Sequence, residues 1–268
     1  MSLTGFRPVP VRYHFIRTLG TRSPAHLFGG YDKINAALEQ GQAVHSIMLG
    51  GDGESGLRVV AYTGGPRTGK KFEEFATANA DALILTPTEY AKVTGMVASL
   101  RAHPLACRAL DGQREQRIEW EMDGVRCRGT PDVHTADFVT ELKTGRTAAI
   151  DEYLGFPRHA QRMHYPAQLG WYGEGLERAK KIRPRFYYIV AVEDEAPFVV
   201  TVFKLTERAL EAGNKTWRGW FERFKVCLEN NHWPAYAPSD GAAIEIDVPE
   251  EMPALIFGDE DEPAADAA

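Results

Sequence analysis

The pattern of apolar and polar positions along the chain changes period several times, and this separates helical segments from strands. Helical spacing predicts helices over residues 31–49 (with a break near Gly41), 71–80, 86–101, 158–181 (with a start near Pro166) and 206–230. Short apolar, β-branched runs predict strands over residues 57–62, 115–121, 125–129, 138–143, 185–192 and 198–205. The proline-containing opening segment, to about Gly30, is expected to be irregular. This order predicts one α/β domain in which helices flank a central mixed β-sheet.

Two of these boundaries carry signals in their own side chains. Thr86 can cap a helix, Pro87 suits the first helical position, and Glu89 can reach back to the backbone of the cap. Asp123-Gly124 lies between two strand-like runs and is a strong signal for a two-residue hairpin turn. Residues 193–197 separate the last two expected strands in the same way, which predicts a second hairpin.

An aromatic stripe follows the last expected helix. Trp217, Trp220, Phe221 and Phe224 are spaced so that they share one helical face. Packing in the core is the simpler explanation, and we expect it. The alternative is a platform on which nucleic-acid bases stack.

Composition limits the class of protein. The chain has 268 residues, 44% of them hydrophobic, which is enough for a real core in one large domain. No apolar run reaches the roughly 18 residues that a membrane helix needs, and residues 1–5 do not resemble the start of a signal peptide. Three scattered cysteines (Cys107, Cys127 and Cys227) are typical of reduced thiols, not of disulfides or a zinc site. We therefore expect a cytoplasmic protein with no membrane partner.

The net charge of −6 argues against a nucleic-acid partner, because phosphate contacts favour lysine and arginine. Much of the negative charge is concentrated near the C-terminus, in Glu250, Glu251, Asp259, Glu260, Asp261, Glu262 and Asp266. Carboxylates of a metal site add more negative charge, which bound cations neutralise. The charge therefore does not exclude a nuclease, and residues 258–268 are expected to form an acidic, disordered tail.

The strongest chemical pattern lies mid-chain, where Glu141 and Lys143 follow nine and eleven residues after Asp132. A strand would place Glu141 and Lys143 on the same face, because strand side chains alternate. Two carboxylates can share a divalent cation that activates water against a phosphodiester, while an ammonium orients that water or stabilises charge. The alternative is an exposed strand with ordinary surface charges. The turn at residues 129–131 and the apolar residues 138–139 favour a site at the end of a sheet.

Two weaker patterns lie on either side of this one. Gln168 and Tyr172 are four residues apart and share a helical face, where an amide and a phenol can hold a phosphate or a water. Alone, this spacing is equally typical of a polar stripe on an ordinary helix. His45 stands among apolar residues, where a histidine usually belongs to the core. It becomes a metal-ligand candidate only if the carboxylates lie near it.

These patterns follow the order seen in a known family. The chain resembles the PD-(D/E)XK nucleases, in particular the branch with the RecE-type exonuclease (exodeoxyribonuclease VIII) and, more distantly, lambda exonuclease and the RecB nuclease domain. The matching pieces are Ser23-Pro24-Ala25-His26-Leu27, Gly41-Gln42-Ala43-Val44-His45, Glu115 with Trp120, the motif of Asp132, Glu141 and Lys143, and Gln168 with Tyr172. They extend over residues 18–175, about three fifths of the chain.

The resemblance implies a restriction-endonuclease-like core with a metal centre. Asp132, Glu141 and His45 would bind Mg²⁺ or Mn²⁺, helped by the backbone carbonyl of Leu142. Lys143 would be the catalytic lysine that positions the nucleophilic water.

The resemblance also implies roles around that centre. Glu115 would be a further acidic contributor, and Gln168 and Tyr172 would hold substrate and water. From their position and donor chemistry, Arg22 and Ser23 are expected to contact a 5′ phosphate or DNA.

The chain departs from the family pattern in three places. The family often has a histidine two residues before the glutamine, where this chain has Pro166, and the nearest histidine is His164. Acidic residues that follow the histidine helix in the family are replaced by residues 50–54, so no ligand is expected there. Related nucleases hold an iron–sulfur cluster with four cysteines, so three cysteines imply no such cluster here.

Together these implications predict one nuclease domain over residues 1–257, with its core at about 18–230. The expected activity is that of a metal-dependent exonuclease on double-stranded DNA ends, resecting 5′ to 3′ in phage-type recombination, in a bacterial or phage-encoded protein. Alternatives are an endonuclease on the same fold and a noncatalytic DNA-end-binding scaffold. Because family members form rings, we expect a homo-oligomer (a trimer or tetramer). Residues 252–257 could recruit a partner such as a single-strand annealing protein, although a solvated tail is the simpler alternative.

Overall fold

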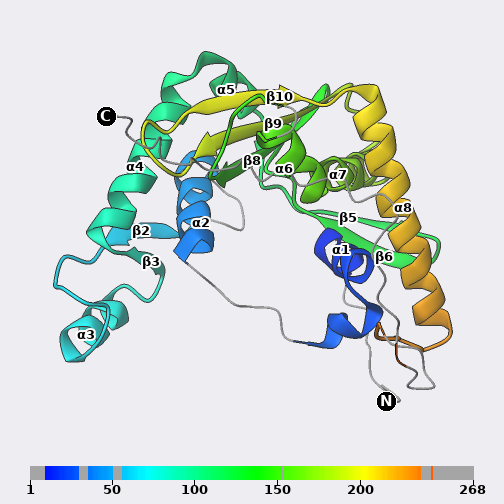
Figure 1. Cartoon of the computed structure of the whole chain (residues 1–268), viewed down its shortest axis with the longest axis horizontal. Coiled ribbons are helices and arrows are strands. Elements are labelled where there is room, and N and C mark those ends of the chain that lie inside the picture. Colours follow the sequence, from blue (N-terminus) through cyan, green and yellow to red (C-terminus); the bar gives the residue numbers. More distant parts are fainter. Residues whose placement is uncertain (1–9, 30–35, 51–55, 152–153, 237–242, 244–268) are drawn as a thin grey trace, which may run out of the picture.

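The computed structural model describes residues 10–29, 36–50, 56–151, 154–236 and 243 (Figure 1). The helices are α1 (Tyr13–Thr21), the 3₁₀ helix η1 (Pro24–Phe28), α2 (Ala36–Leu49), α3 (Lys70–Ala78), α4 (Pro87–Ala102), α5 (Pro104–Ala109), α6 (Phe156–Arg162), α7 (Tyr165–Lys180) and α8 (Glu207–Glu229). The strands are β1 (Val11–Arg12), β2 (Arg58–Ala61), β3 (Ala82–Leu85), β4 (Gln113–Arg114), β5 (Ile118–Met122), β6 (Val125–Gly129), β7 (Val133–His134), β8 (Phe138–Gly145), β9 (Phe186–Glu193) and β10 (Val200–Lys204). Among the described helices, none is long and apolar enough to cross a lipid bilayer.

A five-stranded mixed sheet forms the centre of the molecule. Its strand order is β10-β9-β8-β7-β4; β8 and β9 are parallel, and the other neighbours are antiparallel. A three-stranded sheet, β1-β6-β5, and a parallel pair, β2-β3, complete the described strands. The expected α/β fold, with a mixed sheet flanked by helices, is confirmed.

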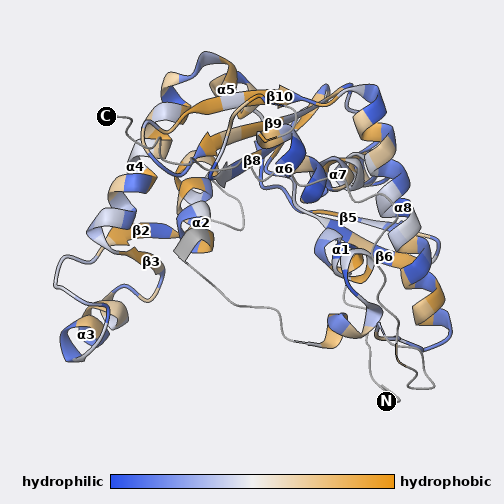
Figure 2. Cartoon of the chain, in the orientation of Figure 1, coloured by the Kyte–Doolittle hydropathy of each residue, from blue (hydrophilic) through white to orange (hydrophobic). Residues whose placement is uncertain are grey.

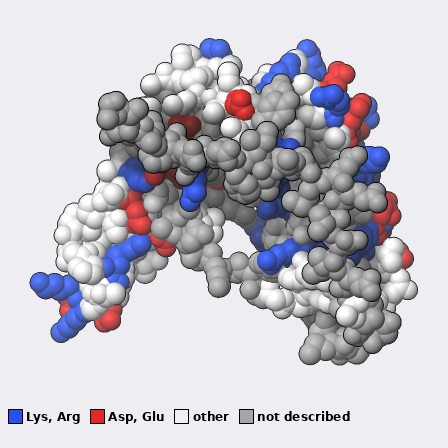
Figure 3. Space-filling view, in the orientation of Figure 1, with Lys and Arg blue, Asp and Glu red and all other residues white. Residues whose placement is uncertain are grey.

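The central sheet separates two apolar layers. Alternation along β8 places Val139 in a core with α7 and α8, and Leu142 in a core with α2 and α4. Figure 1 shows α2 and α4 on one side and α7 and α8 on the other, and Figure 2 shows the apolar residues concentrated in β9 and β10. Below the sheet in these views, a hollow lies between α2 and the part of the molecule that contains α1 and α8 (Figure 3).

The aromatic stripe of α8 belongs to the core, as expected. Trp217, Phe221 and Phe224 are each no more than 1% exposed, and Trp217 packs edge-on against Trp171. Trp220 is only partly buried and lies against Tyr13. The stripe therefore joins α8 to α7 and α1 and leaves no open stacking platform.

Replacing Trp217 by alanine is expected to lower the free energy of unfolding by about 3–5 kcal/mol, because it removes a fully buried indole and leaves a cavity. The matched change, Trp220→Ala, is expected to cost less because that ring is partly exposed. Denaturant unfolding of both variants measures the difference, and equal costs would contradict this packing.

The two local boundary signals are confirmed. Thr86 caps α4, the Glu89 amide donates to its side chain, and the Glu89 carboxylate accepts from the Thr86 backbone N–H. Asp123 and Gly124 have φ angles of 50° and 73°, which are the two positive values that a type I′ hairpin turn needs. β9 and β10 form the second expected hairpin.

Two expectations for the N-terminal third are wrong. The segment expected to be irregular contains β1, α1 and η1. Tyr13, Ile16 and Leu19 recur every three residues in α1 and are buried in the core, which stabilises a helix with no side-chain cap. The break near Gly41 is absent, because α2 is continuous from Ala36 to Leu49. A side-chain atom on Gly41 would come within 3.1 Å of Thr144, so this glycine serves close packing.

The helix expected over residues 158–181 is two helices, α6 and α7. His164 between them has a φ of 59°, a left-handed conformation that ends one helix before Pro166 enters the first turn of the next. The strand expected from Glu115 begins only at Ile118, because Glu115 has a φ of 44° and leaves the strand path. Helix α5 was not expected. The acidic tail and residues 252–257 lie outside the described residues.

Candidate active site

Three acidic side chains lie in a row across three neighbouring strands. β4 pairs with β7 and β7 with β8, and the next residues beyond these registers are Glu115, Asp132 and Glu141. The backbone N–H of Glu115 donates to Asp132 O at 2.9 Å, which continues the ladder by one step. Asp132 and Glu141 are opposite each other one step beyond the β7–β8 register and so share a face, and a ligand atom of Glu115 lies within 4.8 Å of one of Asp132.

Asp132 joins the end of β7 to β8 through its side chain. Its Oδ2 accepts from the backbone N–H of Leu142 at 2.7 Å, and its own N–H points to Glu141 Oε1 at 3.4 Å. Both carboxylates are buried, with Asp132 9% and Glu141 2% exposed. These bonds hold the two acids against each other, although nine residues separate them in the chain.

Lys143 lies on the same face of β8 as Glu141, as its spacing predicts. Its Nζ donates to Glu141 Oε2 at 2.6 Å and lies 4.9 Å from the centre of the Tyr165 ring. Burial alone would lower the pKa of Lys143, but Glu141 and Asp132 together raise it above its ordinary value. The side chain therefore stays an ammonium at neutral pH and acts as a cation, not as a base.

His45 comes from α2 on the other side of Asp132. Its Nε2 lies 3.0 Å from the carbonyl of Leu142 and its Nδ1 lies 3.5 Å from Asp132 Oδ1. Burial and the Lys143 charge lower the pKa of His45, so the ring is neutral near pH 7. A neutral imidazole donates from only one nitrogen, so the other presents a lone pair to an oxygen. A cation placed between that nitrogen lone pair and the facing oxygen would bind both.

Glu115 supplies a third ligand atom to this group. One ligand atom each from His45, Glu115 and Asp132 lie within 4.8 Å of one another. Oε2 of Glu115 is buried with no hydrogen-bond partner among the described residues, which is costly without a cation. Two carboxylates and an imidazole suit a divalent metal ion. Glu141, also expected as a ligand, lies beside Lys143 and the Asp132 amide.

Burial, more than the crowding of negative groups, raises the pKa values of two carboxyls. Burial raises the pKa of Asp132 to about 6, opposed by Lys143 and by the Leu142 hydrogen bond. Burial and the Asp132 charge raise the pKa of Glu141 to about 7, again opposed by Lys143. Without a cation, the site therefore holds protons more tightly than the unfolded chain does.

This proton uptake predicts how stability depends on pH in metal-free protein. Both folded-state pKa values are raised, so the two carboxyls stabilise the fold at low pH, and the effect is lost as pH rises through about 6 and 7. In Asp132→Asn, the residue is neutral at every pH. The Tm of wild type should therefore fall relative to that of the variant between pH 5 and 8. Added Mg²⁺ or Mn²⁺ should restore wild-type Tm most strongly at pH 8, because ligands bind metal deprotonated. Parallel Tm curves would contradict the raised pKa values.

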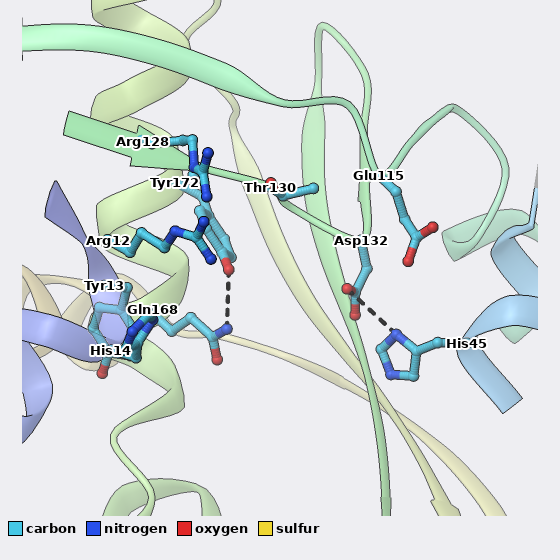
Figure 4. A pocket seen from close by; sticks show the side chains of 11 residues that line it. Arg12, Tyr13, His14, His45, Glu115, Arg128, Thr130, Asp132, Gln168 and Tyr172 are labelled. Atoms are coloured by element: carbon cyan, nitrogen blue, oxygen red, sulfur yellow. Dashed lines mark hydrogen bonds and ion pairs between the residues drawn. The ribbon is translucent and has the colours of Figure 1, made fainter. Parts of the chain in front are cut away.

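An open cavity of about 380 Å³ lies beside the carboxylates (Figure 4). Five of the candidate residues line it: His45, Glu115, Asp132, Gln168 and Tyr172. Gln168 Nε2 donates to the Tyr172 hydroxyl at 3.1 Å, so the two side chains form one polar unit on α7. Burial raises the pKa of Tyr172, so its hydroxyl keeps its proton.

Some candidate residues lie away from this cavity. Glu141 and Leu142 contact Asp132, and Lys143 contacts Glu141, but none of the three is part of the cavity lining. Arg22 and Ser23 are also absent from the lining, and the buried Ser23 hydroxyl bonds to His26 at 2.7 Å. Pro166 occupies the first turn of α7. The backbone carbonyl of His164 accepts a hydrogen bond from the Tyr13 hydroxyl. Residues 51–54, which replace the acidic residues that follow the histidine helix in the family, lie outside the described residues.

The cavity also has lining residues that the sequence patterns did not indicate. They are Arg12, Tyr13, His14, Arg128, Gly129 and Thr130. β1 pairs in parallel with β6, which brings Arg12 opposite Arg128 across a long stretch of chain. β1 has only two residues, so it shows no apolar periodicity in the sequence. The only sequence signal for this part of the cavity is the positive charge of Arg12 and Arg128.

Comparisons with known proteins agree with this architecture. A family model described as "PDDEXK-like domain of unknown function (DUF3799)" matches residues 21–243. The fold is similar to that of a crystal structure from Eubacterium rectale described as a "putative exonuclease", with a TM-score of 0.63 and 12% identity over 93% of this chain and 97% of that one. Among curated proteins, none matches. At this identity the structural likeness concerns the fold alone.

Proposed function

Because this chain belongs to the DUF3799 family of PDDEXK-like domains, we propose that it is a metal-dependent deoxyribonuclease acting at the ends of linear double-stranded DNA. One observation carries the proposal: Glu115, Asp132 and Glu141 lie in a row across three strands, and the Lys143 ammonium is 2.6 Å from Glu141. A buried acidic row beside a lysine and an open polar cavity suits hydrolysis of a phosphodiester.

The ligand set would come from three elements. Asp132 and Glu115 offer carboxylate oxygens from the sheet, and His45 offers a ring nitrogen from α2. Mg²⁺ or Mn²⁺ bound there would polarise the scissile phosphate and make a water more acidic. The Leu142 amide fixes the Asp132 carboxylate, so this ligand is oriented before a substrate arrives.

Lys143 would supply positive charge at the reacting centre. Its raised pKa keeps it protonated, so it can donate to the attacking water or to a phosphate oxygen as negative charge develops. Glu141 holds the ammonium in place through Oε2 and is itself fixed by the Asp132 amide. Glu141 therefore acts here chiefly as the partner that orients Lys143.

Gln168 and Tyr172 would hold the DNA strand in the cavity. Both are donors that line it, and they are already joined by a hydrogen bond. The similar Eubacterium rectale protein is described as a "putative exonuclease", which supports attack at ends. We take 5′-to-3′ resection, a ring-shaped homo-oligomer and an annealing partner as parts of the same proposal.

Digestion of labelled DNA tests the proposal directly. Linear duplex labelled at either end, with and without a 5′ phosphate, is incubated with Mg²⁺, with Mn²⁺ or with a chelator, beside a covalently closed plasmid. We expect loss of linear duplex only with the metal, release of label from the 5′ ends first, and an intact plasmid. Plasmid cleavage would favour an endonuclease, and DNA binding without any cleavage would favour a noncatalytic scaffold.

A further inference from the structure

Two arginines lie side by side at the end of the cavity away from the metal-ligand candidates. Arg12 is opposite Arg128 in the parallel pairing of β1 and β6, so both side chains project from the same face of the sheet. Both line the cavity, and Figure 4 shows them together near Tyr172, with Asp132, Glu115 and His45 on the far side. The cavity therefore has a basic end and an acidic end.

Neither guanidinium has a carboxylate partner among the residues that the structure describes. Glu119 is opposite Arg128 on β5, but its carboxylate pairs with Arg126, two residues earlier on β6, at 3.5 Å. Two adjacent guanidiniums repel each other unless an anion lies between or beside them. Their planar N–H groups suit bidentate contact with a phosphate.

The surrounding backbone adds to the positive potential. Helix α1 begins directly after Arg12, its cap has no side-chain hydrogen bond, and its first turn has no acidic residue. The helix dipole therefore adds partial positive charge beside the two guanidiniums. Figure 3 shows Lys and Arg atoms on the wall of the hollow beside α1 and β6.

From this geometry we propose that Arg12 and Arg128 together bind one phosphate of the DNA strand, at a fixed distance from the scissile phosphate. The inference rests on the proposed nuclease function. The metal group would hold the scissile phosphate at one end of the cavity, and the arginine pair would hold a second phosphate at the other. The second phosphate is either a terminal phosphate or one within the backbone, since both present the same anionic oxygens.

The first test compares three glutamine variants: Arg12→Gln, Arg128→Gln and the matched control Arg126→Gln. Arg126 lies on the same strand and face but is ion-paired and outside the cavity lining. DNA affinity is measured against salt concentration with Ca²⁺ replacing Mg²⁺. We expect Arg12→Gln and Arg128→Gln each to weaken binding about tenfold and to reduce the salt slope by about one, and Arg126→Gln to match wild type. Equal behaviour of all three variants would overturn the proposal.

The second test locates the phosphate. Single uncharged methylphosphonates are placed one at a time along the oligonucleotide, and ends are made with and without a terminal phosphate. In wild type, a methylphosphonate at one position should weaken DNA binding. In Arg128→Gln, a methylphosphonate at that same position should leave the DNA affinity unchanged. A terminal position identifies an end phosphate and an internal one a backbone phosphate; sensitivity spread evenly over all positions would contradict a single subsite. Arg128→Lys, which keeps the charge, should recover part of the affinity and shows that the loss does not come from unfolding.

The two hypotheses fail in different ways. If wild type degrades DNA but Arg12→Gln and Arg128→Gln bind like Arg126→Gln, the nuclease stands and the phosphate subsite falls. If wild type neither binds nor degrades DNA, both fall together.

Discussion

Replacing Lys143 by alanine is expected to reduce Mg²⁺-dependent degradation of linear duplex DNA by about 10²–10³-fold or more, which is the cost of removing one donor that stabilises developing charge. DNA affinity and folding should change little. The partly buried ammonium lies 2.6 Å from Glu141 Oε2, so its loss leaves that carboxyl without a cation. Because the pKa of Glu141 is already raised to about 7, this carboxyl can take up a proton, and the fold is retained.

The matched control is Lys204→Ala. Lys204 is an exposed lysine on β10 that lies over the Phe186 ring, outside the cavity. Single-turnover digestion and a DNA-binding assay, run on both variants and wild type, separate chemistry from binding. If Lys143→Ala cleaves DNA at the wild-type rate, Lys143 is not catalytic. If Lys204→Ala loses as much cleavage activity as Lys143→Ala, the loss is a nonspecific effect of charge.

Replacing Asp132 by asparagine is expected to abolish activity through the metal. Asp132 is the central member of the acidic row, opposite His45 and bonded to Leu142. Changes to residues that merely support a metal ligand cost about 10–100-fold in affinity, so loss of a direct ligand should cost at least about 100-fold. Calorimetric titration with Mn²⁺ measures this loss without any DNA.

Asp137→Asn is the control for that change. Asp137 stands just before β8 and is exposed, and its carboxylate forms a long ion pair with Arg185 at 3.9 Å. It should bind Mn²⁺ and cleave DNA like wild type. Wild-type Mn²⁺ affinity in Asp132→Asn would show that the cation binds elsewhere, and the assignment of the metal group would be wrong.

Local chemistry explains which elements were predictable. The start of α4 is determined by Thr86 and Glu89, and the β5–β6 turn by Asp123 and Gly124, all within a few residues of one another. Helix α1 was missed because it has no cap, and its stability comes from packing on α8, roughly two hundred residues away. Gly41 suggested a break because a sequence shows the missing side chain but not Thr144 beside it.

The same distinction applies to the site. Asp132 precedes β7, and Glu141 and Lys143 lie on the adjacent strand β8 after a short connection. Their spacing, together with the turn at residues 129–131 and the apolar residues 138–139, therefore predicted that they meet. The place of Glu115 depends on the sheet order, in which β4 pairs with β7. The arginine pair depends on a parallel contact between strands more than a hundred residues apart. No local pattern encodes such a contact, so it became visible only in the fold.

Glu115 follows β4, a strand of only two residues at the edge of the central sheet. Short edges of this kind open by local fluctuation more readily than central strands. A cation shared by Glu115 and Asp132 would fasten this edge to β7, in addition to the backbone bond between them. Metal binding would then slow amide hydrogen exchange in β4. The exchange rate of this edge strand would therefore show whether the metal site is occupied.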